Sequence, residues 1–186
     1  MPTRIRLCNR WIYLSFPTEN SLPGDIINLI LDDEYGLRQM QRKPRTILDV
    51  GANIGLFSLL ARHYFPAAII HAYEPNPRVL EFTRGNMVQV GLAPHAFAVG
   101  LKEGLAVMVD QADSLVASTR ASEQGDVLVK ALREMVADIG GQVDLLKLDC
   151  EGAEWEVFRD VETMARIDTI RMEYHLNPRQ TLQQFL

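Results

Sequence analysis

A turn-forming segment, Asp49-Val-Gly-Ala-Asn-Ile-Gly55, stands between a short apolar run and a stretch with helical spacing. Glycine lets the backbone turn tightly at such a place and lets a ligand approach the main chain. Asn53 tolerates left-handed dihedral angles and offers a side-chain amide. The spacing Gly-x-x-x-Gly lacks the third glycine of the dinucleotide-binding fingerprint. We therefore expect a ligand-binding turn between a strand and a helix, and a dinucleotide is disfavoured as its ligand.

Glu74 adds a carboxylate at the end of the next predicted strand, 19 positions after Gly55. An acid at that place can accept hydrogen bonds from both ribose hydroxyls of a nucleoside. Together with Asp49 it suits the sulfonium and ammonium groups of S-adenosylmethionine, whereas two carboxylates would repel a pyrophosphate. The alternative is that Asp49 caps a turn and that Glu74 is merely exposed, but the flanking strands favour the functional interpretation. The residues expected to bind this cofactor are Asp49, Gly51, Ala52, Asn53, Gly55, Glu74, Pro75 and Asn76.

Four polar residues follow two later strands and are the candidate catalytic residues: Asp149, Glu151, Glu173 and His175. Transfer of the sulfonium methyl group of S-adenosylmethionine is an in-line displacement, for which the protein supplies alignment and, for a weakly acidic acceptor, a base. A neutral imidazole at His175 could accept the proton of the acceptor, and Asp149 could do so or could orient the methionine ammonium. Each could instead be a strand-end polar group or a helix cap, Glu151 above all. Acids and a histidine could also hold a divalent metal, but we expect none.

Two further features lie near these residues. Lys147 falls inside an apolar strand, so its charge must reach the surface or find a partner. We expect a structural pair with Asp149 or Glu173. The polar segment from Gln111 to Gly125 is a candidate lid over the adenine or the acceptor, although a mobile loop without a specific function is the simpler interpretation.

The elements that must position these groups alternate between apolar strands and helices. The strands are expected at 46–50, 68–73, 95–99, 143–148 and 169–174, with shorter ones at 105–109 and 127–131, and the helices at 56–64, 77–90, 132–139 and 153–160. Apolar runs without in/out alternation are typical of strands buried on both faces. The sequence therefore predicts a doubly wound, largely parallel α/β sheet, whose strand ends meet at one ligand-binding edge.

The first 45 residues lack the alternation of apolar strands and helices seen after Thr46, and they are expected to form an appendage to a cofactor-binding domain at 46–186. Residues 4–16 alternate loosely and predict a short strand pair. Pro23 and Gly24 break the chain before Asp25, which we expect to cap a helix over Ile26 to Tyr35.

The composition is that of one ordinary globular domain: 186 residues, 47% hydrophobic and 23% charged. A net charge of -5 gives no electrostatic reason to expect a nucleic acid as partner. Cys8 and Cys150 have neither metal-ligand spacing nor a pairing pattern, which favours a reduced protein. We see no signal peptide and no membrane-spanning run. A cytoplasmic protein acting on a small molecule is the expectation.

Three segments, ILDVGANIGLFSLLA, AYEPNP and LLKLDCEGAEWEVF, resemble the FkbM family of S-adenosylmethionine-dependent methyltransferases. The resemblance extends over residues 23–175, and KLDCEGAE followed by EYH is its most specific part. It implies the seven-stranded class I methyltransferase sheet, with a Rossmann-like arrangement. It also implies methylation of a hydroxyl on a sugar, a glycolipid or a polyketide-type small molecule. By the same resemblance the cofactor site would be lined by Asp49, Gly51, Asn53, Gly55, Glu74 and Asn76.

The sequence departs from that family pattern after its fifth strand, where a helix and an antiparallel hairpin normally follow. Either the sequence is a fragment, or its sheet is shortened and lacks the C-terminal hairpin strands; an uncovered sheet edge would allow a homodimer. Two rival interpretations stay open. One is a non-catalytic or truncated methyltransferase-like module that binds a nucleoside. The other is an NAD-dependent oxidoreductase, which the missing glycine and the extra carboxylate disfavour.

Overall fold

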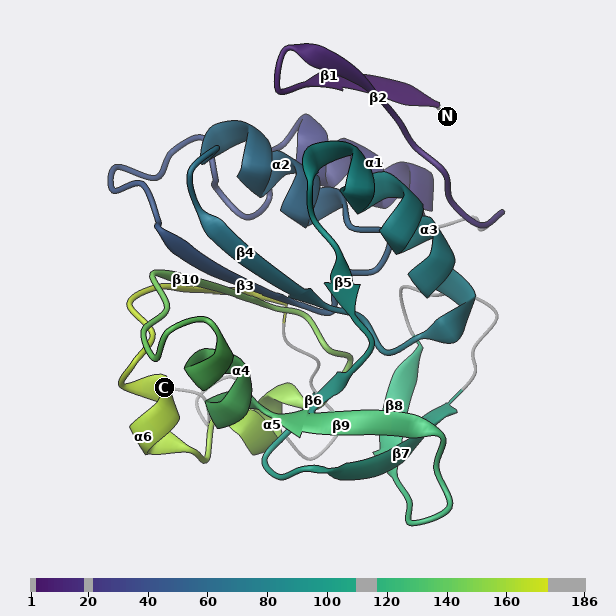
Figure 1. Cartoon of the computed structure of the whole chain (residues 1–186), viewed down its shortest axis with the longest axis vertical. Coiled ribbons are helices and arrows are strands. Elements are labelled where there is room, and N and C mark those ends of the chain that lie inside the picture. The colour runs from purple at the N-terminus through teal and green to yellow at the C-terminus, as the bar shows by residue number, and fades with distance from the viewer. Residues whose placement is uncertain (1–2, 19–21, 110–116, 174–186) are drawn as a thin grey trace.

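The computed structural model of the chain describes residues 3–18, 22–109 and 117–173 (Figure 1). Its central sheet has five strands, all parallel, in the order β11-β10-β3-β4-β5. They are β3 (Thr46–Val50), β4 (Ile69–Tyr73), β5 (Pro94–His95), β10 (Leu145–Leu148) and β11 (Ile170–Met172). The predicted α/β fold with a parallel sheet is confirmed at this level, and β3 has the predicted bounds.

Helices lie on both sides of this sheet, because its strands are apolar on both faces (Figure 1). On one side are α1 (Leu22–Ile30), α2 (Leu56–Tyr64) and α3 (Pro77–Met87), and on the other are α4 (Leu132–Asp138), α5 (Glu154–Val157) and α6 (Val161–Met164). Successive residues of β3 serve opposite faces: Ile47 packs in the core that contains α2, and Leu48 in the core that contains α4. The prediction of α2 is confirmed at both ends.

A second sheet was not anticipated from the sequence. Four strands, in the order β6-β9-β7-β8, form it: β6 (Ala98–Gly100), β7 (Gly104–Val109), β8 (Ser118–Ala121) and β9 (Val127–Ala131). The single strand predicted over residues 95–99 is therefore wrong. The chain turns where Phe97 donates its backbone N–H to the carbonyl of His95, at 3.1 Å, so β5 stays in the first sheet and β6 joins the second.

The same sheet corrects the interpretation of residues 111–125 as a loop. Part of that segment is β8, which pairs with β7 in antiparallel register, Thr119 opposite Met108. Residues 111–116 lie outside the described residues.

At the N-terminus the predicted strand pair is confirmed as β1 (Arg4–Leu7) and β2 (Arg10–Tyr13), an antiparallel hairpin. The predicted helix is displaced, because α1 begins at Leu22 and ends at Ile30. Pro23 does not break this helix, since proline is tolerated in a first helical turn, where its missing N–H has no intrahelical partner. Asp25 consequently lies in the first turn of α1 and is not its cap.

Of two predictions about helix ends, the cap of α3 is confirmed and the extent of the helix after β10 is wrong. Asn76 caps α3, as expected: its side-chain oxygen accepts from the backbone N–H of Arg78 at 3.0 Å, and Pro77 is the first helical residue. The helix predicted over 153–160 is divided, because α5 ends at Val157 and Asp160 caps a separate α6 through Thr163. Among the helices of the described residues, none is long and apolar enough to cross a bilayer.

Candidate functional site

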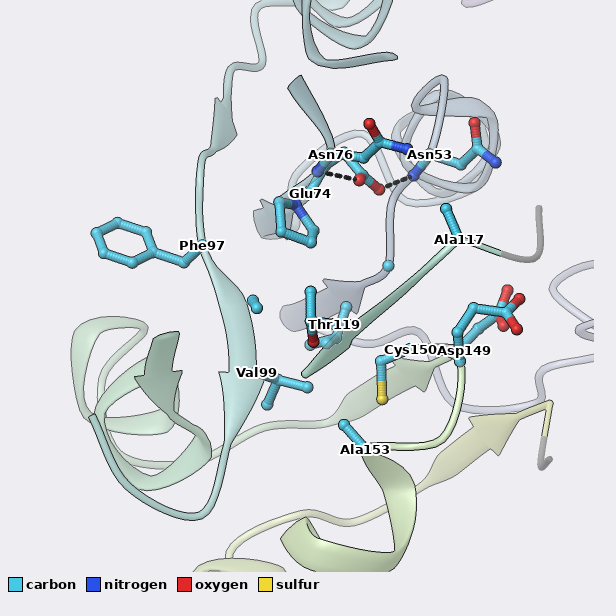
Figure 2. A pocket seen from close by; sticks show the side chains of 15 residues that line it. Asn53, Glu74, Asn76, Phe97, Val99, Ala117, Thr119, Asp149, Cys150 and Ala153 are labelled. Atoms are coloured by element: carbon cyan, nitrogen blue, oxygen red, sulfur yellow. Dashed lines mark hydrogen bonds between the residues drawn. The ribbon is translucent and has the colours of Figure 1, made fainter. Parts of the chain in front are cut away.

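A pocket lies where the carboxyl ends of β3, β4 and β10 meet the edge of the second sheet (Figure 2). Parallel strands bring their carboxyl ends to one edge, which is where open α/β sheets bind ligands. The lining residues are Val50, Gly51, Asn53, Glu74, Pro75, Asn76, Phe97, Ala98, Val99, Ala117, Thr119, Asp149, Cys150, Glu151 and Ala153. Of the expected cofactor residues, Gly51, Asn53, Glu74, Pro75 and Asn76 are therefore brought together in one wall.

The turn after β3 needs its glycines. Gly51, Asn53 and Gly55 have φ angles of 79°, 47° and 83°, a region in which a side chain is strained. A Cβ on Gly51 would lie 1.6 Å from the backbone oxygen of Asp149, and one on Gly55 would lie 2.7 Å from the Met87 side chain. The first glycine thus lets two strand ends approach each other, and the second lets α3 pack against the turn.

Two buried polar residues of α3 hold this turn from behind. Thr83 Oγ1 donates to the carbonyl of Asn53, and Asn86 Nδ2 donates to the carbonyl of Ile54 at 2.9 Å. Asn86 also binds the main chain of Ser15 through both of its amide atoms. The sequence reasoning missed both residues. Two polar residues three positions apart share a helix face, here a fully buried one, but this spacing is equally typical of a solvent-exposed face.

Glu74 is the most informative residue of the pocket. Its carboxylate is only 6% exposed, so the alternative of a merely exposed acid is wrong. Oε2 accepts from the backbone N–H of Asn53 at 2.7 Å, and Oε1 accepts from that of Asn76 at 2.8 Å (Figure 2). Burial raises the pKa of Glu74 to about 7, although these two N–H groups oppose the shift. Each oxygen keeps a further lone pair, so the oriented carboxylate can accept two more hydrogen bonds from a diol.

Asp49 supports the turn and does not line the pocket. It is fully buried, and its Oδ2 accepts from the hydroxyl of Ser58 at 2.6 Å. Its Oδ1 lies 3.8 Å from Lys147 Nζ. Burial raises the pKa of Asp49, while Lys147 and Ser58 lower it. The described geometry places this carboxylate behind the turn, where it holds Lys147, and not in the mouth of the site.

Lys147 joins the two strand ends from inside the molecule. Lys147 is 4% exposed, and its ammonium donates to the carbonyl of Gly51 at 2.6 Å and lies 3.2 Å from Asp149 Oδ2. Burial alone would lower the pKa of Lys147, but Asp149, Tyr35 and Asp49 raise it above its ordinary value. The expected pair with Asp149 is confirmed, and the lysine is charged because three oxygen groups surround it.

The turn after β10 is held by its own helix. Glu154 is fully buried; its Oε1 accepts from the backbone N–H of Cys150 at 3.0 Å and its Oε2 from that of Gly152 at 2.8 Å. Glu151 is not the cap of α5, because the N-cap residue is Ala153, which makes no side-chain cap hydrogen bond. Glu151 has a left-handed backbone, with φ of 54°, and lines the pocket beside Asp149.

The other two catalytic candidates are not placed in the pocket. Glu173 is exposed and follows β11, where its backbone N–H donates to the carbonyl of Leu148 at 3.2 Å. It is not part of the pocket lining within the described chain. His175 lies outside the described residues. No group of three or more metal-ligating side chains is found among the residues that the structure describes.

The remaining walls are mostly apolar and were not predicted. Phe97 comes from the segment between β5 and β6, Ala98 and Val99 come from β6 itself, and Ala117 and Thr119 come from the start of the β8 region. Ala153 and the Cys150 thiol, whose pKa burial raises, complete the wall below β10. The pocket therefore combines an oriented carboxylate for a diol, a second carboxylate at Asp149 and an apolar slot, which together suit a nucleoside with a cationic substituent.

Comparison with known proteins gives a consistent result. A family model described as the methyltransferase FkbM domain matches residues 49–185. Methyltransferase 1 of Beauveria bassiana is 27% identical over 157 residues, which are 68% of this chain and 63% of that protein. The methyltransferase sdnD of Sordaria araneosa is 27% identical over 72% of this chain and 66% of its own length.

A bacterial relative gives the same level of similarity. The 31-O-demethyl-FK506 methyltransferase FkbM of Streptomyces tacrolimicus is 27% identical over 69% of this chain and 65% of its own length. The matched part of the chain spans just under two thirds of each of these three relatives.

Proposed function

Because the chain belongs to the FkbM methyltransferase family, we propose that it binds S-adenosylmethionine in the pocket of Figure 2 and methylates a hydroxyl of a small-molecule acceptor. The single observation that carries this proposal is the Glu74 carboxylate. It is buried at the end of β4, and both of its oxygens are aligned by backbone N–H groups. A carboxylate in that place and orientation is suited to a ribose diol.

The residues present fit this cofactor in two further respects. Gly51 lines the pocket with bare backbone, and any side chain at this position would clash with the backbone of Asp149. The apolar side chains of Val99 and Ala153 would cover a flat ring and exclude water from it (Figure 2).

When bound, S-adenosylmethionine supplies an electrophilic methyl group for an in-line displacement by an acceptor oxygen. In our proposal Glu74 holds the ribose hydroxyls, and Asp149 holds the cationic methionine end. The acceptor hydroxyl must lose its proton, and a carboxylate in the pocket can take it. Asp149 and Glu151 line the pocket, and we propose them for this role; Glu173 and His175 stay predictions.

Finer features of fold and setting belong to the same proposal. The five parallel strands would be the central part of a doubly wound class I methyltransferase sheet, with the cofactor at its carboxyl edge. Cys8 and Cys150 are free thiols, which is compatible with a reducing compartment such as the cytoplasm. Acceptors of the sugar, glycolipid or polyketide type remain the expected class.

Thermal unfolding with different ligands tests the proposal. A ligand that binds only the folded protein, at 100 times its Kd, stabilises it by about 2.7 kcal/mol, which should raise the Tm by roughly 5–10 °C. We expect that rise with S-adenosylhomocysteine and S-adenosylmethionine and none with NAD⁺. A rise with NAD⁺ alone would contradict the proposal. Cofactor binding without methyl transfer to any of a panel of hydroxyl acceptors would favour a non-catalytic binding module.

A further inference from the structure

The segment before the matched family domain contributes one side chain, Tyr35, that contacts the pocket residue Asp149. Tyr35 follows α1, lies outside the matched residues 49–185 and is 8% exposed. Its ring packs edge-to-face against Phe57 of α2, with centroids 5.4 Å apart, and Lys147 Nζ lies 5.6 Å from its centroid. The Tyr35 ring is therefore fixed on two sides by α2 and β10.

The hydroxyl of Tyr35 ends at the carboxylate of Asp149. It donates to Asp149 Oδ2 at 3.4 Å, and Lys147 Nζ approaches the same oxygen at 3.2 Å. Burial raises the pKa of Tyr35 well above its usual range, so the phenol keeps its proton and stays a donor. Since both contacts fall on Oδ2, they set the rotation of the carboxylate and leave Oδ1 to accept a hydrogen bond from a ligand.

Asp149 is the lining residue for which this rotation matters. Its side chain is 22% exposed, and it lies beside Gly51 in the pocket wall. A carboxylate that is held by one oxygen and presents the other is preorganised for a cation, because the ligand need not first order it. Glu74 is prepared for a ligand in the same manner, by Asn53 and Asn76.

From these contacts we infer that Tyr35 is a positioning residue, which orients Asp149 toward the α-ammonium group of the cofactor. The inference rests on the proposed function. It extends the site beyond the matched family domain, to a residue that contacts the ligand only through Asp149. It also predicts which part of the ligand senses Tyr35: the amino-acid end, and not the nucleoside.

A calorimetric double-mutant cycle on the whole chain tests this inference. The proteins are wild type, Tyr35→Phe, Asp149→Asn and the double variant, each titrated with S-adenosylhomocysteine and with 5′-methylthioadenosine, which lacks the amino-acid end. Tyr35→Phe keeps the ring and its contacts with Phe57 and Lys147 and removes one hydroxyl. Tyr64→Phe, on α2, is the matched control. Thermal unfolding of each variant accompanies the titrations.

We expect Tyr35→Phe to weaken S-adenosylhomocysteine binding by about threefold to tenfold and to leave 5′-methylthioadenosine binding and the control unchanged. In the Asp149→Asn background, Tyr35→Phe should have no further effect. Equal weakening of both ligands, additive effects of the two substitutions, or an unchanged affinity would each overturn the inference. If the folded wild type bound neither ligand, the proposed function would fail first and the inference with it.

Discussion

Two strand-to-helix turns meet at the pocket, and they are held in different ways. The turn after β3 is fixed by residues distant in sequence: Thr83 and Asn86 of α3 bind its carbonyls from 30 and 32 positions away, and Lys147 binds Gly51 from 96. The turn after β10 is fixed locally, because Glu154 binds the N–H groups of Gly152 and Cys150, two and four positions away.

The difference separates a turn that depends on distant contacts from one that its own helix holds. The first turn forms only when α3 and β10 are packed in place, so its shape and the stability of the domain depend on the same contacts. The second turn can keep its shape with few outside contacts, and it presents a partly exposed Asp149 to the pocket. Substitutions in the first turn should therefore reduce both the stability of the domain and its affinity for the ligand. Substitutions in the second turn should change one of these two quantities more than the other.

The largest effect is expected from Gly51→Ala. The new Cβ would meet the Asp149 backbone oxygen, and the residue would also keep a φ of 79°. We expect the free energy of unfolding to fall by about 4 kcal/mol and S-adenosylhomocysteine binding to disappear, as measured by urea denaturation and calorimetry.

Gly152→Ala is the matched control in the second turn, since Gly152 has a φ of 105° but open space around it. It should cost only about 1–2 kcal/mol. If the two alanine variants were equally stable, the claimed contrast between the turns would be wrong.

Lys147→Met should come next, because it leaves Asp49 and Asp149 without the cation between them. Breaking a buried pair in this way costs about 3 kcal/mol. The loss should shrink as the pH falls, since the buried Asp49 can then take up a proton. Lys130→Met removes a less buried pair, with Asp138, and should cost less than about 1 kcal/mol. Equal losses at these two lysines would show that Lys147 does not join the turns.

Glu74 should make the unliganded protein less stable as the pH rises. Its folded-state pKa of about 7 lies above the ordinary value of 4.5, so the folded state binds a proton more tightly than the unfolded chain does. The stabilisation is complete below about pH 4.5 and is lost as the pH rises through 7, and roughly 2–3 kcal/mol of it is lost between pH 5 and pH 8. Denaturation at pH 5 and pH 8 should show this decrease in wild type, and a decrease smaller by that amount in Glu74→Ala. An identical pH dependence in the two proteins would contradict the raised pKa.

The smallest effect is expected at the second turn, from Glu154→Gln. The amide keeps one acceptor for the two N–H groups, so the variant should lose about 1 kcal/mol of stability. Its affinity for S-adenosylhomocysteine should change by less than about threefold. Glu156→Gln, at an exposed position of the same helix, serves as the control and should be neutral. A larger loss of binding than of stability at Glu154 would assign this turn a more direct role in the site.

The same contrast explains how far the sequence could predict this site. The elements around the first turn were predictable because local signals determine them: an apolar run gives β3, two glycines give the turn, and Asn76 with Pro77 starts α3. Glu74 was predictable for the same reason, from its place at the end of a strand. What these signals could not reveal was that Asp49 faces away from the pocket toward Ser58 and Lys147.

The contacts that are distant in sequence were the ones missed. Thr83, Asn86 and Tyr35 carry no local motif, and only the packing of α3 and of the segment after α1 brings them to the site. The second sheet was missed because a short apolar segment shows that a strand forms but not which partner it pairs with. Residues 95–99 thus read as one strand, although β5 and β6 pair in different sheets.

Calorimetric titration with S-adenosylhomocysteine at pH 6 and pH 8, for wild type and Glu74→Ala, tests the central claim most directly. The account predicts that wild type binds, and binds more tightly at pH 8, because ribose hydroxyls donate to the ionised carboxylate. It also predicts that Glu74→Ala binds at least about tenfold more weakly, equivalent to about 1.4 kcal/mol, with little dependence on pH. A folded wild-type protein that does not bind, or a Glu74→Ala variant that binds equally well, would contradict it.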